Sequence, residues 1–240
     1  VASSTETAIA GATAQSLRVT PDATTTYRVR VSNSCGNATS QAVVTVLPLP
    51  TVPASVTATY NPVTNANVIT WAASTSSAGI AAYLVERRPG SLQINVTSGT
   101  TYTDTAIVPG VTYVYTVRSR DINSAYSDKS ATEVATTRTF TDDPIVGATP
   151  TAGTAIRGIH LGELRQAIDS VRAAGGLLPA WTSYAAATGV VDADQFIEMR
   201  DRLNEARDQL GLPHVFFTQP VNATQVVRGS ALIELRNGVK

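Results

Sequence analysis

Hydrophobic and polar residues alternate in short runs between residues 49 and 138, and turn-forming residues bound each run. An alternation of period two is typical of strands that bury one face. We expect strands at residues 56–60, 68–71, 83–87, 101–104, 108–117 and 124–127. Several short strands with turns between them predict a β-sandwich over residues 49–138.

Residues 1–48 alternate in the same way, with strands expected at residues 16–20, 27–31 and 42–46. So few strands bury too little apolar surface to be stable alone. This stretch is therefore predicted to be a partial β-domain. It is either a fragment of a longer polypeptide or a sandwich that something else completes. The three prolines within residues 47–53 predict an extended spacer after it.

After Arg138 the hydrophobic period changes from two to about 3.6, which predicts helices over residues 139–240. A Glu-x-Arg motif occurs three times in this region, and an aromatic–Thr pair precedes each copy. The motifs are Glu163-Leu164-Arg165, Glu198-Met199-Arg200 and Glu234-Leu235-Arg236, and the pairs are Phe140-Thr141, Trp181-Thr182 and Phe217-Thr218. These internal repeats predict three loop–helix units, in which each helix needs its neighbours to cover its apolar stripe.

Short local signals mark where these helices begin and end. Gly175-Gly176 is expected to end the first helix as a left-handed cap, and Gly211-Leu212-Pro213 to end the second. Asp192 with Gln195 predicts a capping box at the start of the second helix.

The clearest motif is a Pro109-Gly110 turn that leads into Tyr113 and a strictly alternating run, after a strand that carries the lone Trp71. These residues resemble the fibronectin type III family across residues 49–138. The resemblance implies that Trp71 is the core tryptophan of the second strand. It also implies that Tyr113 is the corner tyrosine, whose hydroxyl bonds backbone a few residues upstream. The integrin-binding Arg-Gly-Asp loop of that family is absent from the sequence.

Two further resemblances complete the predicted architecture. The run from Asp22 through Tyr27 to Cys35 resembles the last three strands of bacterial immunoglobulin-like domains. It implies that Tyr27 is a corner tyrosine and that Cys35 faces a partner cysteine on an early strand, which this sequence lacks. Residues 154–165 resemble repeats at the C-terminal end of long secreted bacterial proteins, which have no assigned activity.

The fold class expected from these patterns is multidomain. All-β sandwiches come first, as a partial immunoglobulin-like domain at residues 1–48 and a fibronectin type III domain at residues 49–138. An all-α helical-repeat domain follows at residues 139–240.

Charge and composition exclude several classes of function. The chain carries 18 basic and 18 acidic residues, so no net field attracts nucleic acid or an anionic membrane. No run of 18 apolar residues occurs, so no membrane span is expected. The first residues lack the charged and apolar regions of a signal peptide. Cys35 is the sole cysteine, so an internal disulfide is excluded and its redox state is left open.

The Glu-x-Arg motifs are the first candidates for a site. Two residues two positions apart on a helix point away from each other, so one motif cannot form a site by itself. We expect each Glu to reach an Arg of the adjacent loop or helix and to fix how the units stack. His160 is near Glu163 and Glu198, which makes it a candidate metal ligand. Its counterparts in the other units are Gln195 and Ala231, so the repeat does not require an imidazole there.

The remaining candidates for chemistry are weaker. His214 follows Pro213 in a loop without paired ligands, and Asp192-Ala193-Asp194 lacks the other positions of a calcium loop. Asp142-Asp143-Pro144 is interpreted as a turn. Two histidines and a distant Cys35 provide no nucleophile–base pair. No catalytic, cofactor-binding or metal-binding residue is therefore predicted, and no cofactor.

Some surface features leave alternatives open. Asn37, Asn95 and Asn222 begin glycosylation sequons and are interpreted as surface turns. Four aromatic residues are candidate platforms for sugar rings: Trp181, Tyr184, Phe216 and Phe217. Because Trp181 and Phe217 recur with the repeat, packing between units is the favoured interpretation.

Together these patterns predict a non-catalytic, extracellular or cell-surface bacterial modular protein that acts as a stalk, an adhesion component or a self-assembly component. Its expected partners are proteins, or other copies of the chain that add a strand to the incomplete N-terminal sandwich, with polysaccharide as a further candidate. The alternative is the accessory C-terminal region of a secreted polysaccharide hydrolase whose catalytic domain lies outside this chain.

Overall fold

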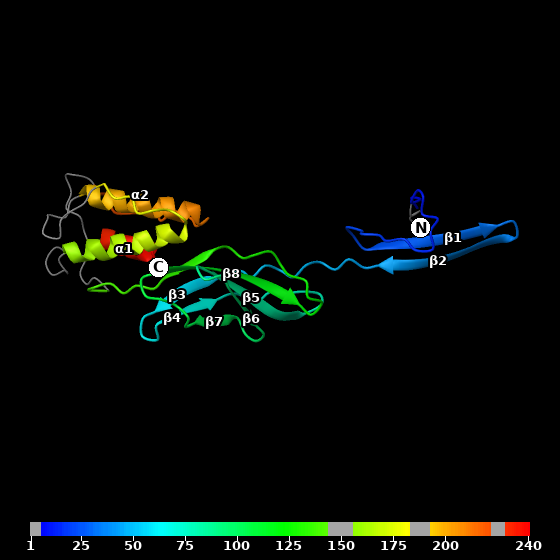
Figure 1. Cartoon of the computed structure of the whole chain (residues 1–240), viewed down its shortest axis with the longest axis horizontal. Coiled ribbons are helices and arrows are strands. Elements are labelled where there is room, and N and C mark those ends of the chain that lie inside the picture. The colour runs from blue at the N-terminus through cyan, green and yellow to red at the C-terminus, as the bar shows by residue number, and fades with distance from the viewer. Residues whose placement is uncertain (1–5, 144–155, 183–192, 222–228) are drawn as a thin grey trace. The chain divides into compact units, whose positions relative to one another are not determined.

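The computed structural model describes residues 6–143, 156–182, 193–221 and 229–240. The chain divides into two compact units, Val1–Pro48 and Leu49–Lys240, which are described separately (Figure 1).

The first unit contains one antiparallel hairpin. Its strands are β1 (Thr25–Asn33) and β2 (Gly36–Val44), which pair over their whole length. Two of the three expected strands are therefore present. The strand expected at residues 16–20 is wrong, because this segment pairs with no strand among the described residues. Cys35 is exposed in the turn of the hairpin, where it does not face an early strand.

The second unit begins with a sandwich of two antiparallel sheets. The strands are β3 (Thr57–Asn61), β4 (Ala66–Thr70), β5 (Ile80–Arg88), β6 (Leu92–Val96), β7 (Thr101–Asp104), β8 (Thr112–Asp121) and β9 (Glu133–Thr136). One sheet has the order β3-β4-β7 and the other the order β6-β5-β8-β9. The prediction of a β-sandwich like that of fibronectin type III domains is therefore confirmed as far as the fold is concerned.

Two local predictions about the sandwich hold. The side chain of Trp71 is in the core at 5% exposure, with its ring centroid 5.2 Å from that of Tyr83. The hydroxyl of Tyr113 accepts a hydrogen bond of 2.9 Å from the backbone N–H of Val108, five residues upstream. This is the corner geometry that the Pro109-Gly110 turn predicts.

The last strands of the sandwich differ from the prediction. Residues 124–127 form a single bridge, Arg120 to Tyr126, and β9 is the final strand. The reason lies in two serines: the backbone N–H of Ser119 donates to the Ser127 hydroxyl, and that of Val117 to the Ser130 hydroxyl, each at 3.0 Å. Side-chain hydroxyls therefore take positions that a strand ladder would otherwise fill. Strand β6 was also not predicted.

The segment that leads into the sandwich is only partly a spacer. Pro50 and Pro53 are buried, and the backbone N–H of Thr51 donates to the carbonyl of Thr75 at 2.9 Å. The second half of the predicted extended segment therefore packs on the sandwich.

Three helices follow among the described residues: α1 (Gly158–Ala174), α2 (Ala193–Gln209) and α3 (Gly229–Gly238). The predicted end of α1 is confirmed, since Gly176 has a φ of 79° and the N–H of Leu177 bonds the carbonyl of Arg172 at 2.8 Å. Helix α2 ends before Gly211, whose φ is 69°. The predicted capping residue Asp192 lies outside the described residues.

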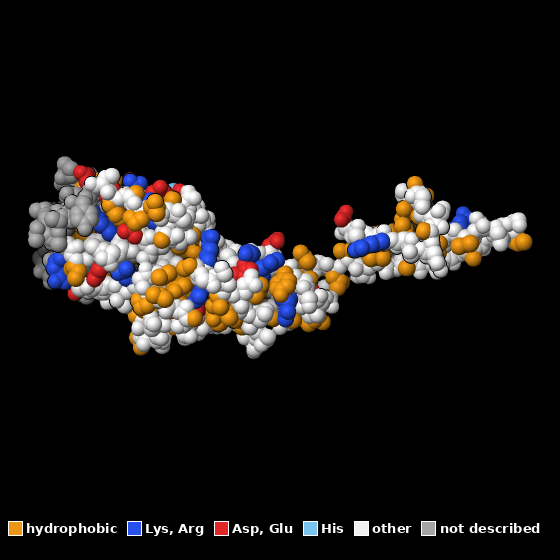
Figure 2. Space-filling model, viewed as in Figure 1, with side chains coloured by type: hydrophobic (Ala, Val, Ile, Leu, Met, Phe, Trp, Pro, Cys, Tyr) orange, Lys and Arg blue, Asp and Glu red, His pale blue; other side chains and the backbone are white. Residues whose placement is uncertain are grey.

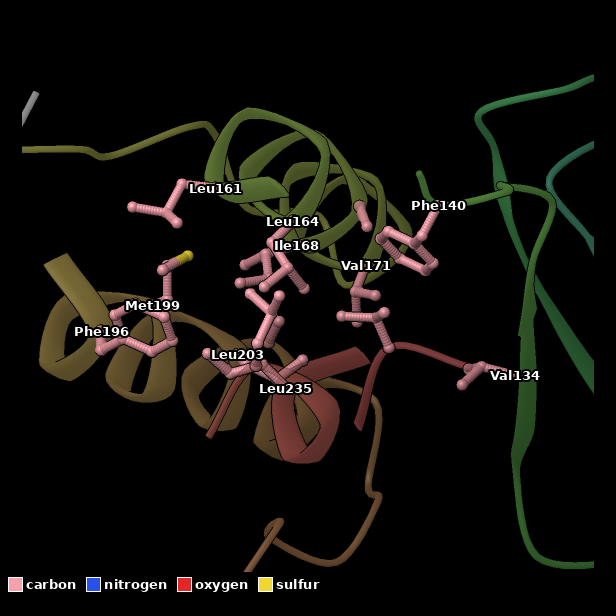
Figure 3. Close-up of a cluster of buried hydrophobic side chains, with 14 of the residues drawn as sticks. Val134, Phe140, Leu161, Leu164, Ile168, Val171, Phe196, Met199, Leu203 and Leu235 are labelled. Atoms are coloured by element: carbon pink, nitrogen blue, oxygen red, sulfur yellow. The ribbon is translucent and has the colours of Figure 1, made fainter. Parts of the chain in front are cut away.

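The hydrophobic core of the helices extends onto the outer face of the sandwich (Figure 3), whose interior is a separate core around Trp71. Val114 of β8 and Val134 of β9 point away from the sandwich interior and belong to the helical core. Polar contacts join the same surfaces, since Ser170 Oγ donates to the carbonyl of Gly110 at 2.6 Å. The division into modules at residues 138 and 139 stays a prediction, and the two parts form one compact unit.

Candidate functional surfaces

Each helix carries a glutamate that binds the aromatic–Thr segment preceding it. In each case the threonine donates both its backbone N–H and its hydroxyl to the carboxylate, with backbone distances of 2.6 to 3.0 Å. The three pairs are Thr141 with Glu163, Thr182 with Glu198, and Thr218 with Glu234. The recurring motif therefore has a recurring role, which is to fix the loop on its own helix.

The arginine of each motif contacts the aromatic ring of a different unit. Arg165 lies 5.4 Å from the ring centroid of Trp181, and Arg200 lies 4.6 Å from that of Phe217. The third arginine returns to the first unit, because Arg236 of α3 lies 4.8 Å from the Phe140 ring. A cation over an aromatic face is attracted by the ring quadrupole. The three contacts therefore link the first unit to the second, the second to the third, and the third back to the first.

Ion pairs connect the same units as the arginine–aromatic contacts do. Arg200 lies 3.3 Å from Glu234, and Arg236 lies 3.8 Å from Glu163. The prediction that a motif glutamate reaches an arginine of a neighbouring unit is confirmed for these pairs. Burial lowers the pKa of both arginines from its ordinary value, and the facing carboxylates oppose that shift. The network therefore acts structurally, by holding the units together.

His160 is completely buried at the start of α1 and has partners on both ring nitrogens. The backbone N–H of Arg157 donates to Nδ1 at 3.2 Å, so Nε2 carries the proton and donates to Asp142 at 3.1 Å. Arg157 also donates to the same carboxylate at 2.6 Å. These hydrogen bonds lower the pKa of Asp142, with that from Arg157 as the first cause. The imidazole therefore fixes the helix start and has no free nitrogen for a metal.

An open hollow on α2 has an acidic lining. It is lined by Thr182, Asp194, Ile197, Glu198, Asp201 and Arg202. Glu198 already accepts both hydrogen bonds from Thr182. Across the described ranges, no group of three or more histidine, cysteine, aspartate or glutamate residues is arranged to hold a metal ion. His214 pairs with Asp208 at 2.6 Å on the exposed surface.

The sandwich contains a buried polar cluster. Asp104 is fully buried and accepts from Arg87 at 2.9 and 3.1 Å and from the Tyr115 hydroxyl at 2.8 Å. Asn67 in turn donates to the Tyr115 hydroxyl at 2.8 Å. Burial raises the pKa of Tyr115 well above its ordinary value, so the phenol stays neutral. The cluster ties the two sheets together, and its side chains are engaged with one another, with only Arg87 partly exposed.

The hairpin of the first unit exposes an apolar face. Tyr27, Val29 and Val31 alternate along β1 on one face, opposite Ala42, Ser40 and Ala38 of β2. Val29 and Val31 are 58% and 67% exposed. Hydrophobic side chains, in orange, lie on the surface of the hairpin in the view of Figure 2. A strand pair with one apolar face normally packs against another layer. Within residues 6–48, this face has no such cover.

The aromatic and glycosylation candidates separate by position. Trp181 and Phe217 stack under arginines, which confirms packing between units, whereas Phe216 is 87% exposed. Tyr184 lies outside the described residues. The interpretation of the sequons as surface turns is wrong for Asn37 and Asn95, which are exposed but lie on strands β2 and β6, and Asn222 is not among the described residues. None of the described helices is long and apolar enough to span a membrane.

Sequence reasoning missed the role of Asp142, which it interpreted as part of a turn. The residue does have a φ of 53°, typical of turns, but its side chain also joins Arg157 and His160. No sequence signal linked it to residues 15 and 18 positions away. The repeat of aromatic–Thr and Glu, by contrast, was visible in the sequence and could have predicted the threonine–glutamate contacts.

No protein-family model matches this chain. Exoglucanase B of Cellulomonas fimi is 31% identical over 139 residues, which cover 54% of this chain and 13% of that protein. The chain therefore matches a small part of the length of this relative.

Solved structures similar to the chain include a Fn3-like protein from Clostridium thermocellum, at 24% identity and a TM-score of 0.33. That match covers 39% of this chain and 99% of the other. Domains A168–A170 of titin match at 19% identity with a TM-score of 0.36, over 48% of this chain and 41% of the other.

Proposed function

We propose that this chain is a non-catalytic accessory region of a secreted bacterial polysaccharide-degrading protein, in which it acts as a spacer between other parts of the polypeptide. The observation that carries the proposal is the 139-residue match to an exoglucanase of which this chain corresponds to a small part. The described side chains support it, because their ionisable clusters are occupied by structural contacts. A fibronectin type III-like sandwich suits the role, since it presents a rigid body without needing a site of its own.

The first test is the mass of the native protein and its association with catalysis. We expect a polypeptide well above the 25.1 kDa of this chain, with glucan-hydrolysing activity that the isolated 240 residues lack. Turnover of a polysaccharide by the isolated chain, abolished by His160→Ala, would overturn the proposal. A native product of the same size as this chain would also count against it.

A second candidate function is self-association through the N-terminal hairpin, which the exposed Val29 and Val31 favour. Strand addition to this incomplete sandwich would join copies of the chain into a stalk or filament on the cell surface. Val29→Lys places a charge on the apolar face, and Gln41→Lys places the same charge on the opposite face.

Light scattering over a concentration series distinguishes these outcomes. We expect the wild-type chain and the Gln41→Lys variant to associate and the Val29→Lys variant to stay monomeric. A monomeric wild-type chain at every concentration would exclude self-association and leave the spacer role unaffected.

A further inference from the structure

The last helix holds the segment with which the helical region begins. Arg236 of α3 is 1% exposed, lies over the ring of Phe140, and donates to the carbonyls of Thr141 at 2.7 Å and Asp142 at 3.1 Å. Phe140 comes only four residues after Thr136, the last residue of β9. The third member of the arginine–aromatic series therefore binds the point where the chain leaves the sandwich.

A second set of contacts lies beside the first. The hydroxyl of Thr136 donates to the carbonyl of Val239, 103 residues away in the sequence, and both residues are buried. The Lys240 ammonium lies 3.2 Å from Asp143. The first and last residues of the stretch from Thr136 to Lys240 are therefore adjacent in space, and the helices form a loop whose two ends are fastened together.

We propose that these contacts, termed the closure, act as a mechanical clasp. The closure consists of Thr136 with Val239, Arg236 with the segment Phe140 to Asp142, and Lys240 with Asp143. A load that enters through the sandwich and leaves after Lys240 passes from β9 directly to the end of α3. The helices between these points carry no tension while the closure holds, because their ends are not pulled apart.

This inference deepens the spacer role proposed above and rests on that role for its biological use, although the closure can be tested without it. A loaded spacer has to keep its length. When the closure opens, the applied force can extend the 103 residues between its ends. At roughly 3.5 Å per extended residue, that is a gain of about 350 Å. Without a closure, the helical region would extend unit by unit, by roughly 120 Å for each 35 residues.

Optical tweezers on the full chain test the proposal. The handles attach to Leu49→Cys, which replaces an exposed side chain, and to a cysteine added after Lys240, in a Cys35→Ser background. We expect the first event to be a single gain of about 350 Å, with the sandwich opening separately. Arg236→Met, which removes the guanidinium contacts, should raise the opening rate about tenfold at the same force.

Arg202→Met is the matched control, because Arg202 lies in the interior of α2 and pairs with Glu205 outside the closure. We expect it to open like the wild type. If Arg236→Met does not fold, Lys240→Ala removes a half-exposed closure contact and should still speed opening. First gains of roughly 120 Å, or opening rates that no closure variant changes, would overturn the clasp. Such a result would leave the accessory role standing, since the mass and activity of the native protein test that role independently.

Discussion

Gly238, the last residue of α3, contacts two side chains of the helical core so closely that no methyl group fits. A Cβ built at this position would lie 2.6 Å from Val215 Cγ2 and 2.8 Å from Leu203 Cδ2. Leu203 is completely buried and Val215 is a stiff, β-branched residue, so neither can move away freely. Gly238→Ala therefore forces the end of α3 away from α2.

Two opposing effects decide the sign of this substitution. Alanine in place of glycine stabilises a helix by about 0.5–1 kcal/mol. Overpacking a closed core costs about 1–3 kcal/mol. The balance is a loss of about 1–2 kcal/mol, because the helix gain is smallest at a helix end. For a domain of this size, that loss lowers Tm by roughly 2–8 °C.

Gly162 provides the matched control, since it lies inside α1 and a Cβ there would meet no atom within 4 Å. Gly162→Ala should raise Tm by roughly 1–4 °C. Thermal unfolding followed by circular dichroism measures both variants. A Gly238→Ala protein as stable as the wild type would refute the packing argument. Adding Val215→Ala should recover part of the loss, as a double-mutant cycle would show.

Three further predictions concern charged groups. Asp104→Ala leaves the largely buried Arg87 without its carboxylate, which should cost about 3–5 kcal/mol in chemical denaturation. Asp104→Asn keeps the shape of the side chain but not its charge, so it should cost nearly as much, and a negligible loss in this variant would contradict an ionic role. The pKa of Asp142 is lowered in the folded state, chiefly by Arg157, so the ionised carboxylate stabilises the fold at neutral pH and this contribution is lost as the pH falls below about 4. In thermal melts between pH 2 and 6, the Tm of Asp142→Asn should therefore fall less with acid than the Tm of the wild type. Burial raises the pKa of Glu133, and the charge of Arg207 only partly opposes this, so the ionised carboxylate destabilises the fold at neutral pH. Glu133→Gln should therefore raise Tm at pH 7, by an amount that shrinks as the pH falls. A Tm difference between variant and wild type that does not change with pH would refute this explanation.

The sequence predicted those features of the fold that depend on neighbours along the chain. Trp71, Tyr113 and the glycine ends of the helices were identified because each has a short-range signature in turn or cap chemistry. The alternation of β8 also showed which residues face the sandwich core. It could not show that Val114, on the other face, is buried beneath helices that begin more than forty residues later.

The candidate site was predictable only as far as repetition revealed it. Three copies of Glu-x-Arg indicated contacts between units, and the pairs Arg200–Glu234 and Arg236–Glu163 confirm that reasoning. A contact that occurs once, such as Asp142 with His160, leaves no periodic trace. The apparent strand at residues 124–127 failed for a related reason, since alternation does not reveal when a serine hydroxyl takes over a backbone partner.

The core that the helices share with the outer face of the sandwich has a consequence for inheritance. A recombination event that transferred residues 49–138 alone would produce a sandwich in which Val114 and Val134 are exposed to solvent. The helices left behind would lose the apolar surface against which they pack. Exchange between genes is therefore expected to favour the whole segment from Leu49 to Lys240. Homologues in which the sandwich occurs without the helices should carry polar residues at the positions of Val114 and Val134.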